Sequence, residues 1–226
     1  MILLDALYLH SYGGNSILNL FINYIIKNKL TNHFFLLLDS RFKNKSNIEI
    51  KFQSILGGED NRRKFYFKKI FKFSSVLCLG NVPPPIKLKL PVLIYFHNEL
   101  LLDSSKSNLN FKQKIISKLK FYYIKHKSYK NYKWAVQTKR IEEILIRKLT
   151  LHKKNVSLYP IFEEKKIEKQ KKEKNSFLNV SNSLPHKNLN NFLLAFVNFM
   201  KNTRINAVLH LTYLKKDLDI SLNEIP

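Results

Sequence analysis

The stretch at residues 177–196, FLNVSNSLPHKNLNNFLLAF, contains a strand, a polar turn and an amphipathic helix in immediate succession. Residues 177–181 form the apolar strand, and apolar side chains recur at helical spacing over 189–200. The turn ends in Lys187 and Asn188, just before the helix. A helix N-terminus presents free N–H groups and a partial positive charge, so this unit suits a phosphate, with Lys187 as an added cation. An ordinary strand–turn–helix with a solvated lysine fits the same residues.

Apolar runs and helical patterns also alternate along the chain before this stretch. Strands are expected at 2–9, 34–38, 48–52, 76–79, 92–96, 134–137 and 156–161, and at 207–211 after the helix. Helices are expected at 17–26, 61–73, 106–133 (one helix or a pair) and 139–149. This alternation predicts an α/β protein with a Rossmann-like parallel sheet in its N-terminal part.

Three polar or glycine-rich clusters follow predicted strands. They are Gly13-Gly14-Asn15, the loop from Gly80 through Asn81 to Pro83-Pro84-Pro85, and His97-Asn98-Glu99. Ligands of open α/β sheets bind beyond the carboxyl ends of the strands, so these clusters predict a site in the first half of the chain. Each has a structural alternative. Gly13 and Gly14 form a turn before a helix capped by Asn15 or Ser16, and the prolines make a rigid turn. His97 is a satisfied structural histidine, and Glu99 caps the next segment.

A nearly all-charged segment, EEKKIEKQKKEKN at 163–175, separates the two parts of the chain. With a single apolar residue it has the composition of a solvated linker or an exposed helix. We therefore expect an N-terminal domain at 1–162, a linker at 163–175 and a partial second domain at 176–226.

The formal net charge of +24 suggests an anionic partner. Only six of the 40 basic residues are arginine, however, and the richness in Lys, Asn, Ile and Phe is typical of an AT-rich genome. The planar guanidinium group of Arg binds phosphates and base edges through two nitrogens, which the Lys ammonium group cannot do. A basic nucleic-acid-binding domain is therefore the less favoured interpretation. The lysine-rich segment 106–133 is either a solvated face or a patch that contacts an anionic membrane surface.

Cysteine and hydropathy patterns point to a cytoplasmic protein. Cys78 is the only cysteine, so no disulfide forms within the chain, as expected in a reducing compartment. The start of the chain lacks the basic region of a signal peptide, and no apolar run reaches about 18 residues. The histidines show no metal-ligand spacing, and we expect neither a metal nor a cofactor. A peripheral position on the inner face of a membrane is compatible with these features.

Four motifs, in this order, resemble those of group 1 (family 4-like) glycosyltransferases, which have the GT-B fold. They are the first strand followed by Tyr12-Gly13-Gly14, the strand VLIYFHN at 92–98 with its terminal His97, the strand and hydroxyl residue Val136-Gln137-Thr138, and SNSLPHKN at 181–188. The resemblance extends over essentially the whole chain. It implies two Rossmann-like domains that face a cleft. It also implies the transfer of a sugar from a nucleotide-diphosphate sugar to a polysaccharide or lipid-linked acceptor, with retention of the anomeric configuration and without a metal. Such a reaction belongs to surface polysaccharide or lipopolysaccharide assembly.

The resemblance also implies roles for individual residues. Lys187, with Asn188, would neutralise the donor diphosphate, most strongly as the leaving phosphate gains charge. Gly13 and Gly14 would let backbone N–H groups approach the donor phosphate or the acceptor. His97 would lie near the reacting sugar as the catalytic candidate. The acceptor-side residues would be Asn15, Asn81, Pro83, Asn98 and Glu99.

The chain departs from the family pattern in two ways. Ser181 or Asn182 replaces the glycine that commonly precedes the lysine segment, and the glutamate pair of the family's donor domain is absent. The chain then resembles an acceptor domain plus the first βαβ of a donor domain. Two expectations stay open: an enzyme that is truncated or completed by a second chain, and a non-catalytic remnant or subunit that keeps the fold.

Overall fold

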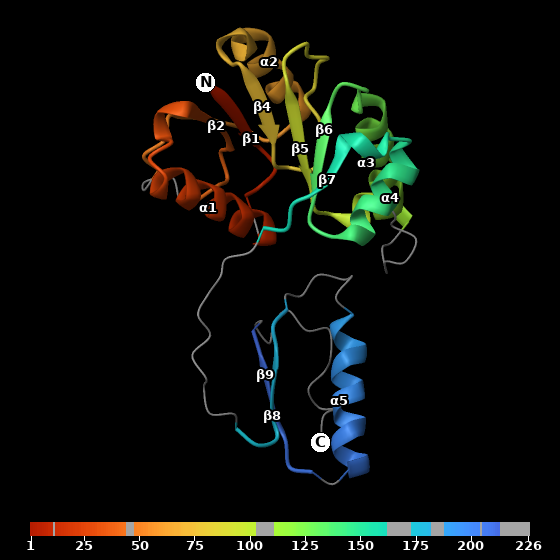
Figure 1. The fold of residues 1–226 in the computed structure, drawn as a ribbon. Coiled ribbons are helices and arrows are strands. Elements are labelled where there is room, and N and C mark those ends of the chain that lie inside the picture. Colours follow the sequence, from red (N-terminus) through yellow and green to blue (C-terminus); the bar gives the residue numbers. More distant parts are fainter. Residues whose placement is uncertain are drawn as a thin grey trace. The chain divides into compact units, whose positions relative to one another are not determined.

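The computed structural model describes residues 1–10, 12–43, 48–102, 111–161, 173–181, 188–203 and 205–212. The chain divides into two compact units (Figure 1). The first comprises Met1–Asp103 and Ile116–Glu164, and the second comprises Ser104–Ile115 and Lys165–Pro226. Each unit contains a parallel sheet, so the protein belongs to the α/β class.

The first unit is built on a seven-stranded parallel sheet with the order β3-β2-β1-β4-β5-β6-β7. Its strands are β1 (Ile2–Ala6), β2 (Phe34–Asp39), β3 (Phe52–Ile55), β4 (Ser75–Cys78), β5 (Val92–Phe96), β6 (Lys133–Val136) and β7 (Val156–Leu158). In register, Leu4 of β1 lies between Leu36 of β2 and Leu77 of β4. The strand order reverses between β1 and β4, which makes the sheet Rossmann-like and places its switch point there.

Helices cover both faces of this sheet. They are α1 (Tyr12–Lys27), α2 (Glu59–Lys69), α3 (Phe111–Lys127, of which Phe111–Ile115 belong to the second unit) and α4 (Lys139–Leu149), with short 3-10 turns at Thr31–His33, Ile70–Lys72, Glu99–Leu101 and Lys153–Asn155. The side chains of Leu18 and Ile25 from α1 join the core on one face. On the other face Phe65, Ile124 and Leu145, from α2, α3 and α4, pack in one core with Trp134.

Two local predictions are corrected by the structure. Gly13 and Gly14 lie in the first turn of α1 instead of a preceding turn, so Asn15 and Ser16 are helical residues and not caps. Residues 48–51 are not a strand, because β3 begins at Phe52, which pairs with Leu36. Of these residues, Lys51 makes one backbone bond to β2, from Leu36 N to its carbonyl at 2.9 Å. The alternation otherwise reflects burial, because Ile50 is 2% exposed and belongs to the core on the α1 face.

The second unit contains a βαβ arrangement. Strand β8 (Ser176–Asn179) pairs in parallel with β9 (Val208–Leu211), and α5 (Leu189–Thr203) connects them in sequence. Phe177 of β8 contacts Phe196 and Phe199 of α5, at ring-centroid distances of 5.7 and 6.2 Å. The turn 182–187, including Lys187, and most of the predicted linker, 162–172, lie outside the described residues.

Candidate functional site

A cavity of about 610 Å³ opens at the carboxyl edge of the first sheet. It is lined from the loops after β1, β2, β4 and β5 and from the helices α2 and α3. The lining residues are Tyr8, His10, Arg41, Glu59, Gly80, Asn81, Val82, Asn98, Leu101, Lys120, Tyr123 and Ile124. Since β1 and β4 flank the reversal in strand order, the cavity occupies the place where open α/β sheets bind their ligands.

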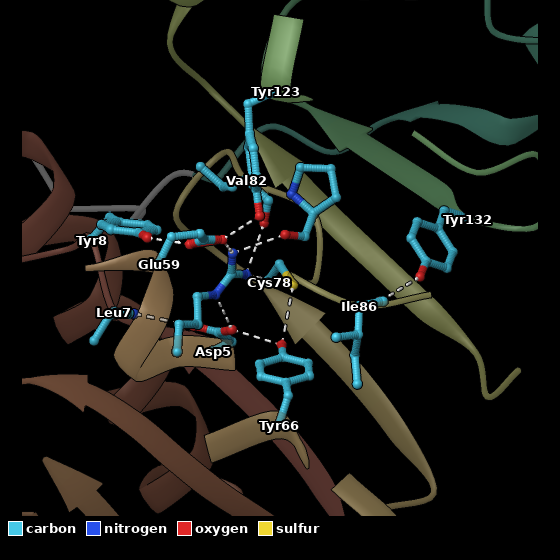
Figure 2. A network of polar contacts seen from close by, with 12 residues as sticks. Asp5, Leu7, Tyr8, Glu59, Tyr66, Cys78, Val82, Ile86, Tyr123 and Tyr132 are labelled. Carbon is cyan, nitrogen blue, oxygen red and sulfur yellow. Dashed lines mark hydrogen bonds and ion pairs between the residues drawn. The ribbon is translucent and has the colours of Figure 1, made fainter. Parts of the chain in front are cut away.

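A buried ion pair between Asp5 and Arg62 is linked to the cavity through Glu59, which accepts from Arg62 and lines the cavity (Figure 2). The Arg62 Nε atom donates to Asp5 Oδ2 at 2.8 Å, and both side chains are at most 2% exposed. The Tyr66 hydroxyl donates to the same Asp5 oxygen at 2.6 Å. Burial alone would lower the pKa of Arg62, but the adjacent Asp5 carboxylate outweighs it and raises that pKa well above its ordinary value. Burial, reinforced by Asp5, also raises the pKa of Tyr66, which keeps its proton.

The other donors of Arg62 hold the loop after β4. Its two terminal nitrogens donate to the carbonyls of Pro83 at 2.8 Å and Val82 at 3.1 Å, and to Cys78 Sγ at 3.6 Å. A further bond goes to Glu59 Oε1 at 2.9 Å. With the bond to Asp5, all five guanidinium N–H groups have acceptors. The Gly80–Pro85 loop is therefore fixed through its carbonyl groups by one buried cation.

Glu59 carries this network to the cavity. Besides Arg62, its carboxylate accepts from the hydroxyls of Tyr8 at 2.5 Å and Tyr123 at 2.6 Å, which converge on it from different elements (Figure 2). Burial and the nearby Glu59 charge raise the pKa of both phenols, so both remain donors at neutral pH. Gly80 lets Tyr8 pack closely, because a Cβ there would lie 3.2 Å from the Cβ of Tyr8. The result is a rigid carboxylate between two aromatic rings.

Asn81 joins the loop after β4 to the end of β5. Its Oδ1 atom accepts from the backbone N–H groups of His97 at 2.7 Å and Asn98 at 3.0 Å. The Nδ2 group must then donate to His97 Nε2, 3.3 Å away, which places the imidazole proton on Nδ1. Burial lowers the pKa of His97 to about 4, so the ring is neutral at physiological pH. The Nδ1 atom is buried and has no hydrogen-bond partner.

Basic groups also line the cavity. Arg41 forms a bidentate ion pair with Asp39: its Nε atom donates to Oδ1 at 2.8 Å and its Nη2 atom to Oδ2 at 2.7 Å. His10 Nδ1 lies 3.6 Å from Asp39 Oδ2. Burial by itself would raise the pKa of Asp39, but the hydrogen bonds from Arg41 outweigh it and lower that pKa. A Cβ at Gly57 would come within 2.6 Å of both side chains of the pair, so this position has room only for glycine. Lys120 adds a further cation from α3.

The structure brings some of the sequence-predicted residues together and separates others. Asn81 and Asn98 line the cavity, and His97, which is not among the lining residues, is hydrogen-bonded to Asn81. Pro83 contributes its carbonyl to Arg62, and Glu99 forms an ion pair with Arg140 at 2.7 Å.

The donor-side predictions lie elsewhere. Gly13 and Gly14 are in the first turn of α1, and the half-buried Asn15 has an unpartnered Oδ1 atom. Asn188 immediately precedes α5 with a φ of 52°, and its carbonyl accepts from Phe192 N. Lys187 is outside the described residues.

The charged network of Asp5, Arg62 and Glu59 was not predicted from the sequence. Asp5 was the one residue of this network that the sequence could have indicated. It lies inside a continuous apolar strand, and a carboxylate in a buried strand needs a charged or hydrogen-bonding partner. Neither Arg62 nor Glu59 has a comparable local signature, and Tyr123 looks like one more side chain of a basic helix.

No protein-family model matches the chain, and no curated protein matches it either. Among the described helices, none offers an apolar stretch of the length needed to cross a bilayer. Within the same part of the chain, no group of three His, Cys, Asp or Glu side chains has the arrangement of a metal site.

Proposed function

We propose that this chain is a glycosyltransferase-like protein of the GT-B type, which transfers a sugar from a nucleotide-diphosphate sugar to a polysaccharide or lipid-linked acceptor. The observation that carries the proposal is the cavity at the switch point of the β3-β2-β1-β4-β5-β6-β7 sheet, with its carboxylate, amide and phenol groups. The order of the four sequence motifs and the βαβ arrangement of the second unit support it.

The cavity groups suit a polyhydroxylated ligand. Three of the roughly four acceptor positions of the Glu59 carboxylate are occupied by Arg62, Tyr8 and Tyr123, which leaves one for a ligand hydroxyl. The two phenol oxygens donate to Glu59 and keep lone pairs that accept from other hydroxyls. Because this frame is fixed before a ligand arrives, little ordering entropy is lost on binding. In the proposal these groups hold the acceptor sugar.

The second unit is assigned to the donor. In this proposal Lys187 and the N-terminus of α5 neutralise the diphosphate, and the charge of Lys187 counts most as the leaving group departs. Gly13 and Gly14, in the first turn of α1, take their donor-side role from the sequence resemblance alone, because a Cβ at Gly13 would meet nothing within 4 Å and the position does not require glycine. His97 is neutral, and its Nδ1 atom is buried, so in this proposal it does not act as an acid. It holds Asn81, which lines the cavity.

The test is calorimetric binding of a panel of nucleotide sugars to the full chain, followed by transfer assays with glycan acceptors. Lys187→Ala is expected to weaken donor binding by roughly tenfold, the loss of one charge-assisted contact. Lys201→Ala removes an exposed lysine near the end of α5 and is the matched control, expected to bind like the parent. Absence of binding to every nucleotide sugar, or equal losses in both variants, would refute the donor assignment.

A second candidate is a non-catalytic subunit of a two-chain glycosyltransferase. Strand alternation puts Leu178, Val180 and Val208 on the face of the β8–β9 sheet opposite Phe177, and they are 66, 77 and 55% exposed. Parallel sheets are normally covered on both faces, so this face favours a further protein element as its cover. This candidate predicts a stably folded first unit with no donor affinity until that protein is added.

A further inference from the structure

The face of α3 that is turned away from the sheet is apolar. Ile124 is the buried residue of this helix and anchors its inner side in the core. Phe111, Ile115, Leu119 and Tyr122 follow one another at steps of four, four and three residues, so they form one stripe on the opposite side. They are 80, 43, 64 and 63% exposed. A surface helix of a globular protein usually presents polar side chains there.

Lysines border this α3 stripe on both sides. At about 100° per residue, Lys112 lies along one edge, and Lys118 and Lys125 lie along the other. All three are exposed. An outward apolar stripe between rows of lysine is the pattern of helices that lie in the plane of a membrane interface.

We propose that the α3 stripe rests on an anionic lipid bilayer, with its apolar side chains at the boundary of headgroups and acyl chains and its lysines among the headgroups. Charge complementarity selects this occupant, because the chain carries a net charge of +24 and lysine is depleted from the cores of protein interfaces. A nucleic acid would use the lysines and leave four apolar side chains without a role. The stripe from Phe111 to Tyr122 is about 17 Å long.

The experiment is co-sedimentation of the full chain with vesicles of phosphatidylcholine and phosphatidylglycerol in equal parts, and with vesicles of phosphatidylcholine alone. Binding is expected only to the anionic vesicles. The triple variant Ile115→Ser, Leu119→Ser, Tyr122→Ser removes the apolar stripe and should weaken binding by at least about tenfold. The charge variant Lys112→Glu, Lys118→Glu, Lys125→Glu should weaken it by roughly a hundredfold.

A control variant, Phe67→Ser with Phe71→Ser, removes two exposed aromatic side chains from the α2 region and should bind like the parent. Equal loss in this variant, binding to neutral vesicles as strong as to anionic ones, or unchanged binding of the serine triple variant would overturn the proposal. So would a parent dimer in sedimentation that the triple variant dissolves, because the stripe would then be covered by a second copy. The six α3 positions that are changed do not line the cavity. The vesicle assay needs no nucleotide sugar. Its result would therefore stand even if the glycosyltransferase proposal failed.

Discussion

Replacing Arg62 by methionine tests whether the buried ion pair stabilises the first unit. Arg62 is 1% exposed, and methionine keeps most of the apolar stem while removing the charge and all five donors. The change leaves the Asp5 carboxylate with hydrogen bonds from the Tyr66 hydroxyl and from Leu7 N at 3.3 Å, but without a cation. The carbonyls of Val82 and Pro83 lose their donors at the same time.

The expected cost follows from these contacts. Removing one partner of a buried pair typically costs about 3–5 kcal/mol, mostly because the remaining charge stays buried. A domain of this size has a total free energy of unfolding of about 5–15 kcal/mol, so Arg62→Met should bring the first unit close to unfolding at room temperature. Adding Asp5→Asn removes the stranded charge, and the double variant should recover at least about 1 kcal/mol relative to the sum of the single changes.

Urea unfolding followed by tryptophan fluorescence is the assay. Trp134 is the only tryptophan of the chain and is fully buried in the first unit, so its emission reports on that unit. Arg140→Met is the matched control, because Arg140 pairs with Glu99 at the surface and should shift the midpoint little. If Arg62→Met cost less than about 1 kcal/mol, or if Asp5→Asn gave no recovery, the ion pair would not be the stabilising element that the geometry indicates.

Three further outcomes follow from the buried groups of the first unit. Burial lowers the pKa of His97 to about 4, below its value of about 6.5 in the unfolded chain. The free energy of unfolding should therefore fall by up to roughly 3 kcal/mol as the pH drops from about 6.5 to about 4. His97→Gln should remove this pH dependence from the urea midpoints, and an unchanged pH dependence would contradict the reasoning. Asn81 has a φ of 65°, so Asn81→Ala should be less stable than Asn81→Gly by about 1 kcal/mol, although both lose the same hydrogen bonds. Burial, reinforced by Asp5, raises the pKa of the Cys78 thiol to about 12, so little of the reactive thiolate forms in the folded protein. Iodoacetamide should therefore label Cys78 only in urea. Rapid labelling of the folded protein would show that the thiol is accessible.

The fold was predictable where local signals agreed. The run at 92–96 becomes β5 and the pattern at 139–149 becomes α4, each with the expected bounds. Thr138 supplies the reason for the second match, because its Oγ1 atom accepts from Ile141 N and caps the helix. At 48–51 the alternation was misleading: Ile50 is buried by α1-face packing, which periodicity cannot distinguish from strand pairing.

The site was predictable only in its location. The rule that ligands bind beyond strand ends selected the loops that supply Asn81 and Asn98 to the cavity. The groups between them come together over long sequence distances: Arg62 meets Asp5 across 57 residues, and Tyr123 meets Glu59 across 64. No local spacing encodes such contacts, and only the finished sheet places α2 and α3 beside the same strand ends.

The use of arginine explains why this network stands out in a lysine-rich chain. Six arginines occur among 40 basic residues, so composition alone would put lysine at most basic positions. Yet Arg41 and Arg140 each bind a carboxylate through two nitrogens, and Arg62 satisfies five acceptors where lysine has three donors. At these three positions arginine makes contacts that need its planar guanidinium group. Lysine at 62 would leave buried acceptors unpaired, which predicts that Arg62→Lys destabilises the first unit although it conserves the charge.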